Sequence, residues 1–172
     1  RANYRAIKEI GVKKIIATTT VCSLNPARKP GYFVLTDQFL DFTKNRINSF
    51  YEGGTRGVCH VDVTEPYCPI LRADLAREGN ALGIHIHNGG TYVCTEGPRF
   101  ETPAEIKMFH ILGGDLVGMT SVPEVVLAHE AEMCYATIST VTNFAAGISP
   151  TKLTQQEVLD TLTANGANIK KL

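Results

Sequence analysis

Residues 96–106 read Glu-Gly-Pro-Arg-Phe-Glu-Thr-Pro-Ala-Glu-Ile, and they join a strand-like run, Thr91–Thr95, to the start of a helix. Thr102 is a good N-cap, Pro103 suits the first helical position, and Glu105 completes a capping box. The stretch is thus predicted to form a strand-to-helix corner. Corners of this kind are where open α/β sheets bind ligands.

Two side chains at this corner suit a planar ligand. Phe100 offers an aromatic face, and Glu101 beside it offers two acceptor oxygens. A purine with an N–H donor on its edge would match both groups. The alternative interpretation is a packed Phe beside a solvated Glu, and this stretch alone does not separate the two.

The remainder of the chain alternates strand-like with helical segments. Strands are expected over 13–19, 32–38, 58–63, 84–87, 91–95, 115–120 and 134–142, and helices over 70–82, 103–112, from Ser121 and from Thr154, with a long loop over 41–57. The alternation predicts a three-layer α/β/α fold with a mostly parallel mixed sheet. Residues 1–172 are long enough to form a single domain around one core.

Composition argues against several classes of partner. Seventeen basic and seventeen acidic residues cancel, so neither nucleic acid nor an anionic membrane has electrostatic support. The five cysteines are scattered and odd in number, which favours buried thiols in a reducing cytoplasm over a disulfide framework. No Cys-x-x-Cys occurs, and we expect no metal. Because the chain opens in a helical pattern without Met, we expect further sequence upstream.

Three other clusters have both a functional and a structural interpretation. The hydroxyls of Thr18–Thr20, at the end of the first strand, could hold an anion such as phosphate, or could be β-branched strand filler. Cys59 and His60 are adjacent on a predicted strand and would face opposite sides, which disfavours a catalytic dyad. His85 and His87 share a face and could bind a metal, but a solvated face is the favoured interpretation.

Four segments end in chemically useful residues: Thr19-Thr20, Phe100-Glu101, Met119-Thr120 and Asn143. The carboxyl ends of parallel strands meet at one rim of a sheet, so we expect these residues to lie together. They would combine hydroxyls for an anion with an apolar floor, an aromatic face, a carboxylate and an amide.

At these residues the sequence resembles the trimeric purine nucleoside phosphorylase and methylthioadenosine phosphorylase family. The matching segments are Thr18-Thr19, 49–53, 56–60, 96–100, 119–128 and Thr142-Asn143. The resemblance covers almost the whole chain. It implies a homotrimer that uses inorganic phosphate as co-substrate, without a cofactor, to release a purine base from a nucleoside.

The resemblance also implies a role for each matching position. Thr19 and Thr120 match positions that contact phosphate, and Met119 matches the residue that packs against the ribose. Phe100 matches the aromatic that stacks on the base. Asn143 matches the residue that bonds N7 and the 6-substituent. His60 matches a position that reaches into a neighbouring subunit's active site near the sugar 5′ end.

Glu101 and Asn143 predict the base. The branch of the family that uses 6-aminopurines has a small residue and an Asp at these positions. Glu101 can accept from N1–H of a 6-oxopurine, whereas it would face an acceptor, N1, in adenine. Asn143 can donate to O6 or N7. We therefore expect a hypoxanthine-type or guanine-type base, with Glu101 and Asn143 as catalytic residues.

The sugar is predicted from the last helix. Ordinary inosine/guanosine phosphorylases tend to carry a His near its start, and here Gln155 and Leu159 could instead line a pocket for a methylthio group. We therefore expect S-methyl-5′-thioinosine as substrate, with a general inosine/guanosine phosphorylase as the alternative.

Residues 20–23 are bulkier than the small residues usual in the family. Because the family begins about 70 residues earlier, with residues that complete the phosphate site, an inactive binding or assembly piece is a further alternative. A nucleosidase that uses water is a third.

Overall fold

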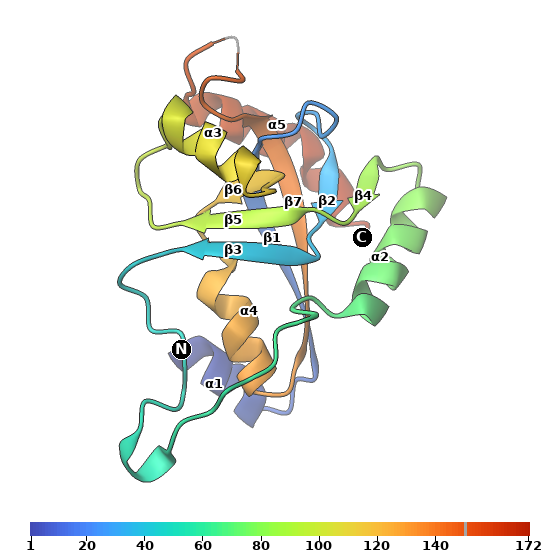
Figure 1. The fold of residues 1–172 in the computed structure, drawn as a ribbon. Helices are drawn as coiled ribbons and strands as arrows, with labels where there is room; N and C mark the ends of the chain where they lie inside the picture. Colours follow the sequence, from blue (N-terminus) through green and yellow to red (C-terminus); the bar gives the residue numbers. More distant parts are fainter. Residues whose placement is uncertain (150) are drawn as a thin grey trace.

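The computed structural model describes residues 1–149 and 151–172 as one sheet with helices on both faces (Figure 1). The strands are β1 (Lys14–Ser23), β2 (Phe33–Leu35), β3 (Gln38–Phe42), β4 (Ile86–Asn88), β5 (Thr91–Thr95), β6 (Leu116–Gly118) and β7 (Cys134–Phe144). The helices are α1 (Ala2–Glu9), η1 (Gly54–Arg56), α2 (Pro69–Ala81), α3 (Pro103–Ile111), α4 (Ser121–Glu130) and α5 (Gln155–Ile169).

The seven strands form one mixed sheet in the order β3-β5-β6-β1-β7-β2-β4. The parallel pairs are β1–β7, β2–β4, β3–β5 and β5–β6, and the antiparallel pairs are β1–β6 and β2–β7. The longest pairing joins β1 to β7 from Lys14↔Cys134 to Ser23↔Phe144. The predicted fold class, a mostly parallel mixed sheet in an α/β protein, is confirmed.

Each face of the sheet packs against its own helices. Tyr92 and Cys94 on β5 belong to the core under α1 and α4, whereas Val93 between them packs with Ile106 and Phe109 of α3. A third cluster joins α2 and the end of α5 to β2 and β7. This alternation follows from the two-residue period of a strand, and it buries apolar side chains on both faces.

The helices at the corner and at the chain end begin as predicted. Thr102 accepts from the Glu105 N–H, and Thr154 accepts from the Glu157 N–H, and each glutamate side chain accepts from its cap's own N–H. Both are complete capping boxes. Among the described residues, no helix is long and apolar enough to cross a membrane.

Three local predictions differ from the structure. Residues 58–63 are irregular and mostly exposed instead of forming a strand. The expected strand over 32–38 is split between β2 and the start of β3. The helix expected from Ser121 is present as α4, but it is not regular from its start, because Val122 has extended dihedrals (φ −113°, ψ 130°).

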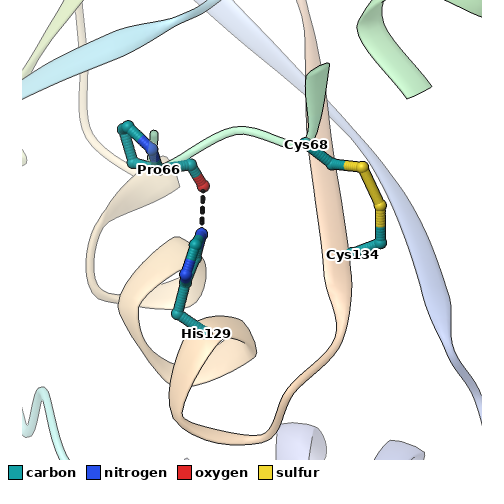
Figure 2. The surroundings of a disulfide bond; sticks show 4 residues. All are labelled: Pro66, Cys68, His129 and Cys134. Carbon is teal, nitrogen blue, oxygen red and sulfur yellow. Dashed lines mark hydrogen bonds between the residues drawn. A yellow bond between two sulfur atoms is a disulfide. The ribbon is translucent and has the colours of Figure 1, made fainter. Parts of the chain in front are cut away.

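A disulfide joins Cys68 to Cys134, with 5.3 Å between their Cα atoms, which corrects the expectation that the cysteines would be free (Figure 2). Nearby, His129 Nε2 donates to the Pro66 carbonyl oxygen over 2.8 Å. The disulfide attaches the irregular segment before α2 to β7, and the histidine attaches the same segment to α4. A 66-residue separation in sequence gave no local sign that these two cysteines would meet.

Candidate active site

A pocket of about 300 Å³ lies at the predicted corner, within the range of small-molecule sites. Residues from five parts of the fold line it: Thr20, Val21 and Cys22 of β1; Pro98, Phe100 and Glu101 of the corner; Val117 to Thr120 at the end of β6; Thr142 of β7; and Gln155 and Val158 of α5. Of the predicted site residues, the pocket brings together Thr20, Phe100, Glu101, Met119, Thr120 and Gln155.

Thr19 and Thr120 lie together, but not because both end parallel strands at one rim of the sheet, as expected. Thr19 and Thr20 lie in the middle of β1, not at its carboxyl end. β6 runs antiparallel to β1, with Cys22 opposite Val117, so the chain that leaves β6 passes beside the middle of β1. As a result, the Thr19 and Thr120 hydroxyls are 2.7 Å apart and hydrogen-bonded.

A second cavity, of about 470 Å³, adjoins the first. Hydroxyl-bearing residues supply most of its lining, among them Thr18, Thr19, Thr137 and Thr140, and it shares Thr20 and Thr120 with the first pocket. Its other polar wall residue is Glu124, whose carboxylate accepts from the hydroxyls of Tyr4 (3.0 Å) and Tyr135 (3.1 Å). Burial, followed by the charge of Glu124, raises the pKa of Tyr4. The threonine hydroxyls of this cavity can donate to an anion, whereas the Glu124 carboxylate on the same wall is already hydrogen-bonded to the two tyrosines.

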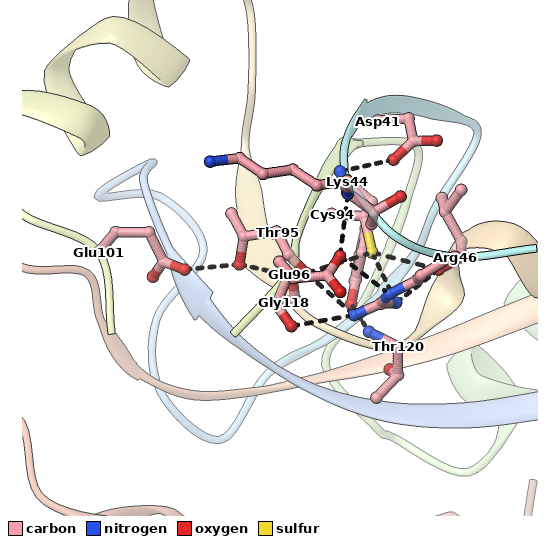
Figure 3. Close-up of polar contacts among 12 residues, drawn as sticks. Asp41, Lys44, Arg46, Cys94, Thr95, Glu96, Glu101, Gly118 and Thr120 are labelled. Atoms are coloured by element: carbon pink, nitrogen blue, oxygen red, sulfur yellow. Dashed lines mark hydrogen bonds and ion pairs between the residues drawn. The ribbon is translucent and has the colours of Figure 1, made fainter. Parts of the chain in front are cut away.

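The Glu101 carboxylate is held in the first pocket. The residue is only 8% exposed, and its Oε1 accepts from the Thr95 hydroxyl over 2.7 Å (Figure 3). Phe100 beside it is 39% exposed, so its ring borders the open side. An aromatic ring and a buried carboxylate therefore stand side by side on the wall, as the sequence predicts.

Arg46 holds the backbone around the corner in place, and the sequence analysis did not identify this arginine. Its guanidinium donates to the carbonyl oxygens of Val122 (2.6 Å), Thr95 (3.2 Å) and Glu96 (3.2 Å). Figure 3 shows Arg46 beside Thr95 and Glu96. It also lies 3.5 Å from the Glu96 carboxylate, which accepts from the Lys44 N–H. The expected long loop over 41–57 carries no local pattern that marks this arginine.

Two glycines set how closely the walls approach. A Cβ at Gly97 would lie 2.6 Å from Met119 Sδ, and the φ of Gly97, +69°, also favours glycine. Gly118 lies against Tyr92, whose hydroxyl accepts from the Thr120 N–H over 3.2 Å. Met119 and Thr120 are thus positioned by contacts that only glycine allows.

Asn143 does not reach the wall of the pocket. It is 6% exposed and borders a neighbouring surface depression with Glu157 and Asp160. Its Nδ2 donates to Cys22 Sγ over 3.2 Å and to the Phe144 carbonyl over 3.1 Å. Cys22, which was not among the predicted site residues, lines the pocket and is the hydrogen-bond partner of Asn143.

The remaining predicted residues lie apart. Leu159 is 48% exposed and outside the pocket lining, where Val158 takes its place. His60 is exposed in the irregular stretch between η1 and α2. His85 and His87 pack around Tyr32, with ring centroids 4.7 and 5.6 Å away. Within residues 1–149 and 151–172, no group of three or more His, Cys, Asp or Glu side chains could hold a metal.

Known proteins are similar to this chain along its whole length. The model of the Phosphorylase superfamily matches residues 1–172. Probable 6-oxopurine nucleoside phosphorylase from Moorella thermoacetica is 56% identical over all 172 residues, which make up 66% of that relative. Probable S-methyl-5′-thioinosine phosphorylase from Methanothermobacter thermautotrophicus is 55% identical over 160 residues, 93% of this chain and 54% of that relative.

A solved structure agrees with the fold. Methylthioadenosine phosphorylase from Schistosoma mansoni, in complex with adenine, superposes with a TM-score of 0.94 and 33% identity, over 99% of this chain and 66% of that one. The chain spans about two thirds of the length of the curated relatives it matches. The full-length match and the shared fold establish that the chain belongs to the Phosphorylase superfamily.

Proposed function

We propose that the protein containing this chain catalyses phosphorolysis of a 6-oxopurine nucleoside, in which inorganic phosphate displaces the base and leaves a sugar 1-phosphate. One observation carries the proposal. A pocket walled by Phe100 and the buried Glu101 shares Thr20 and Thr120 with a neighbouring cavity that is lined mostly by hydroxyl-bearing residues. With a base in the pocket and an anion in the cavity, the sugar would lie between them, next to Thr20 and Thr120.

The Glu101 carboxylate supports a 6-oxopurine. One of its oxygens is committed to Thr95, and the other can accept from N1–H of hypoxanthine or guanine. Adenine has an acceptor at N1, and a buried acceptor facing it without a hydrogen costs about 1–3 kcal/mol. Several relatives bear names with 6-oxopurine or thioinosine as substrate, which agrees with this reading.

The threonines support phosphate as the nucleophile. A phosphate oxygen would attack C1′ of the sugar while the C1′–N9 bond breaks, and the purine would leave with the bonding pair and then take up a proton. Thr19, Thr20 and Thr120 supply hydroxyls where the nucleophile would lie, and catalysis would come from positioning and charge stabilisation. We propose no cofactor and no metal.

For the sugar we propose a 5′-methylthio group. The α5 residues in the pocket are Gln155 and Val158, and the described lining contains no histidine that could bond a 5′-hydroxyl. Val158 presents an apolar side chain to that region. Inosine is the alternative substrate, and relatives named for each of the two activities are similarly close to this chain.

Turnover assays on the natural polypeptide that carries this sequence test the proposal. Release of hypoxanthine should require phosphate and should be faster from S-methyl-5′-thioinosine than from inosine. Release from neither nucleoside would refute the function, and release without phosphate would identify a nucleosidase. Faster turnover of inosine would refute only the sugar.

The base assignment has its own test. Glu101→Ser together with Asn143→Asp should shift preference toward 6-aminopurine nucleosides, and Glu101→Ser alone should lower kcat/KM for 6-oxopurines by roughly 5- to 100-fold. Glu65→Ser, at an exposed carboxylate outside the pocket, is the matched control. Unchanged preference in the double variant would refute the assignment.

We further propose that the protein works as a homotrimer in the cytoplasm, where one subunit's His60 meets the sugar of its neighbour. His60 is exposed and lies outside the lining of its own pocket. Light scattering of the natural protein would give the trimer mass, and a monomeric, fully active enzyme would refute the assembly. Cell fractionation tests the location.

A further inference from the structure

The Thr95 hydroxyl donates to one oxygen of the Glu101 carboxylate. It lies 2.7 Å from Glu101 Oε1 and 3.5 Å from the Gly118 carbonyl oxygen. A hydroxyl has a single hydrogen, and the longer of these two distances is beyond the usual range of an O–H···O bond. The shorter distance is typical of a hydroxyl bound to a carboxylate, which is among the stronger hydrogen bonds in proteins. The hydrogen of Thr95 is therefore committed to Glu101.

The backbone around Thr95 fixes where this hydroxyl lies. Thr95 is the last residue of β5 and is paired with Phe42 on the parallel strand β3. Its carbonyl oxygen accepts from Arg46 Nη2 over 3.2 Å, and Figure 3 shows Thr95 between Arg46 and Glu101. A β-branched side chain on a fixed backbone has few rotamers. The donor thus has a set position before any ligand binds.

The Glu101 side chain depends on this donor for its orientation. Its backbone lies in the irregular segment before α3, and ordering its several rotatable bonds costs conformational entropy. Within residues 1–149 and 151–172, Thr95 is the one donor to this carboxylate. The second oxygen, Oε2, has no donor there and yet is not a fully buried unpaired atom, so it reaches the accessible surface, and Glu101 lines the pocket.

We propose that Thr95 is a positioning residue for base selection, which orients Glu101 so that Oε2 accepts from N1–H of a 6-oxopurine. The proposal deepens the proposed function and rests on it. Thr95 lies outside the pocket lining, so it acts through Glu101 and not on the base itself. A hydrogen bond depends on direction as well as distance, and a carboxylate that is free to turn would hold the N1–H less well.

The role concerns the choice between bases more than affinity in general. Adenine presents an acceptor at N1, so an oriented carboxylate gains no hydrogen bond from it. The Thr95 hydroxyl therefore strengthens the binding of hypoxanthine or guanine without strengthening that of adenine.

Paired affinities for hypoxanthine and adenine test this role. Thr95→Val removes the hydroxyl and keeps the shape of the side chain, and calorimetry on the natural polypeptide would give both dissociation constants from one preparation. The preference for hypoxanthine should fall about two- to ten-fold, the range of one hydrogen bond. Thr95→Ser keeps the donor and should keep the preference within about two-fold. A merely structural role would weaken both bases equally, and that result would overturn the inference.

A double-mutant cycle tests whether Thr95 acts through Glu101. In the Glu101→Ala background, Thr95→Val should leave the affinity for hypoxanthine unchanged within about two-fold, because the carboxylate that Thr95 orients is gone. Equal losses of affinity in the two backgrounds would overturn the inference.

The matched control is Thr91→Val, at the opposite end of β5 and outside the pocket lining, which should keep the wild-type preference. The measurements also separate the two levels of the proposal. If the natural protein prefers hypoxanthine and Thr95→Val keeps the full preference, this inference fails and the proposed function stands. If the natural protein binds no hypoxanthine, both fail.

Discussion

Gly118 is a position where one added methyl group should disturb the threonine site from inside the core. In Gly118→Ala, the new Cβ would overlap the Tyr92 hydroxyl and lie 2.9 Å from Tyr92 Cζ and 3.2 Å from the Thr20 carbonyl oxygen. Tyr92 is fully buried, so its ring has no open space to move into. The Thr20 oxygen belongs to the backbone of the long strand β1, which also resists displacement.

The expected loss is the sum of two effects. Overpacking of a core costs about 1–3 kcal/mol. Displacing the Tyr92 hydroxyl also breaks the hydrogen bond from the Thr120 N–H, which is worth about 1 kcal/mol. We therefore expect Gly118→Ala to lower the free energy of unfolding by about 2–4 kcal/mol. Because Thr120 moves with its N–H, the proposed function also predicts a higher KM for phosphate.

Urea denaturation followed by circular dichroism would measure this loss. The matched control is Gly166→Ala within α5, where nothing lies within 4 Å of the added Cβ. There the helix preference of Ala should raise stability by about 0.5–1 kcal/mol. Tyr92→Phe removes the overlapped oxygen, so the double variant should lose about 1 kcal/mol less than the sum of the single variants. Full additivity, or a loss below about 0.5 kcal/mol for Gly118→Ala, would refute the steric reasoning.

Three further predictions concern the corner. Thr102→Ala should lower the free energy of unfolding by about 1 kcal/mol by breaking the capping box of α3, with Thr154→Ala on α5 as its counterpart, both read by thermal denaturation. Arg46→Ala should cost about 2–4 kcal/mol in urea denaturation because three carbonyl oxygens lose their charged donor, and Arg46→Lys should recover only part of it. Bonding to Arg99 lowers the pKa of Glu105 to about 2 from its usual 4.5, so its stabilising effect is complete above pH 4.5 and is lost as pH falls toward 2. The stability difference between wild type and Glu105→Gln should vanish over that range in acid titrations of unfolding.

The corner could be predicted from sequence because its determinants are local. A threonine, a proline and a glutamate within four residues specify the start of α3 by their own hydrogen bonds and dihedrals, whatever the rest of the chain does. Phe100 and Glu101 come directly before this helix start, so their place at the corner follows from it. The same holds for α5, where Thr154 and Glu157 repeat the pattern.

Residues that act over long sequence separations were missed. Arg46 bonds Val122, 76 positions away, and no feature of the 41–57 loop distinguishes it from a solvated arginine. Cys68 and Cys134 pair only because α2 begins beside the start of β7. Residues 58–63 have a β-branched pattern, yet they find no partner strand among the described residues and stay irregular.

The antiparallel pairing of β1 with β6 explains why Thr19 and Thr120 lie together, as expected, although they do not both end parallel strands at one rim of the sheet. β6 pairs with β1 only at Cys22 and Ser23, so the chain leaving β6 passes Thr20 and Thr19 in the reverse direction. Had β6 been parallel, Thr120 would lie beyond the end of β1, remote from Thr19. The two-cavity arrangement therefore depends on strand direction, because the hydroxyls at the boundary come from the middle of one strand and the end of its neighbour.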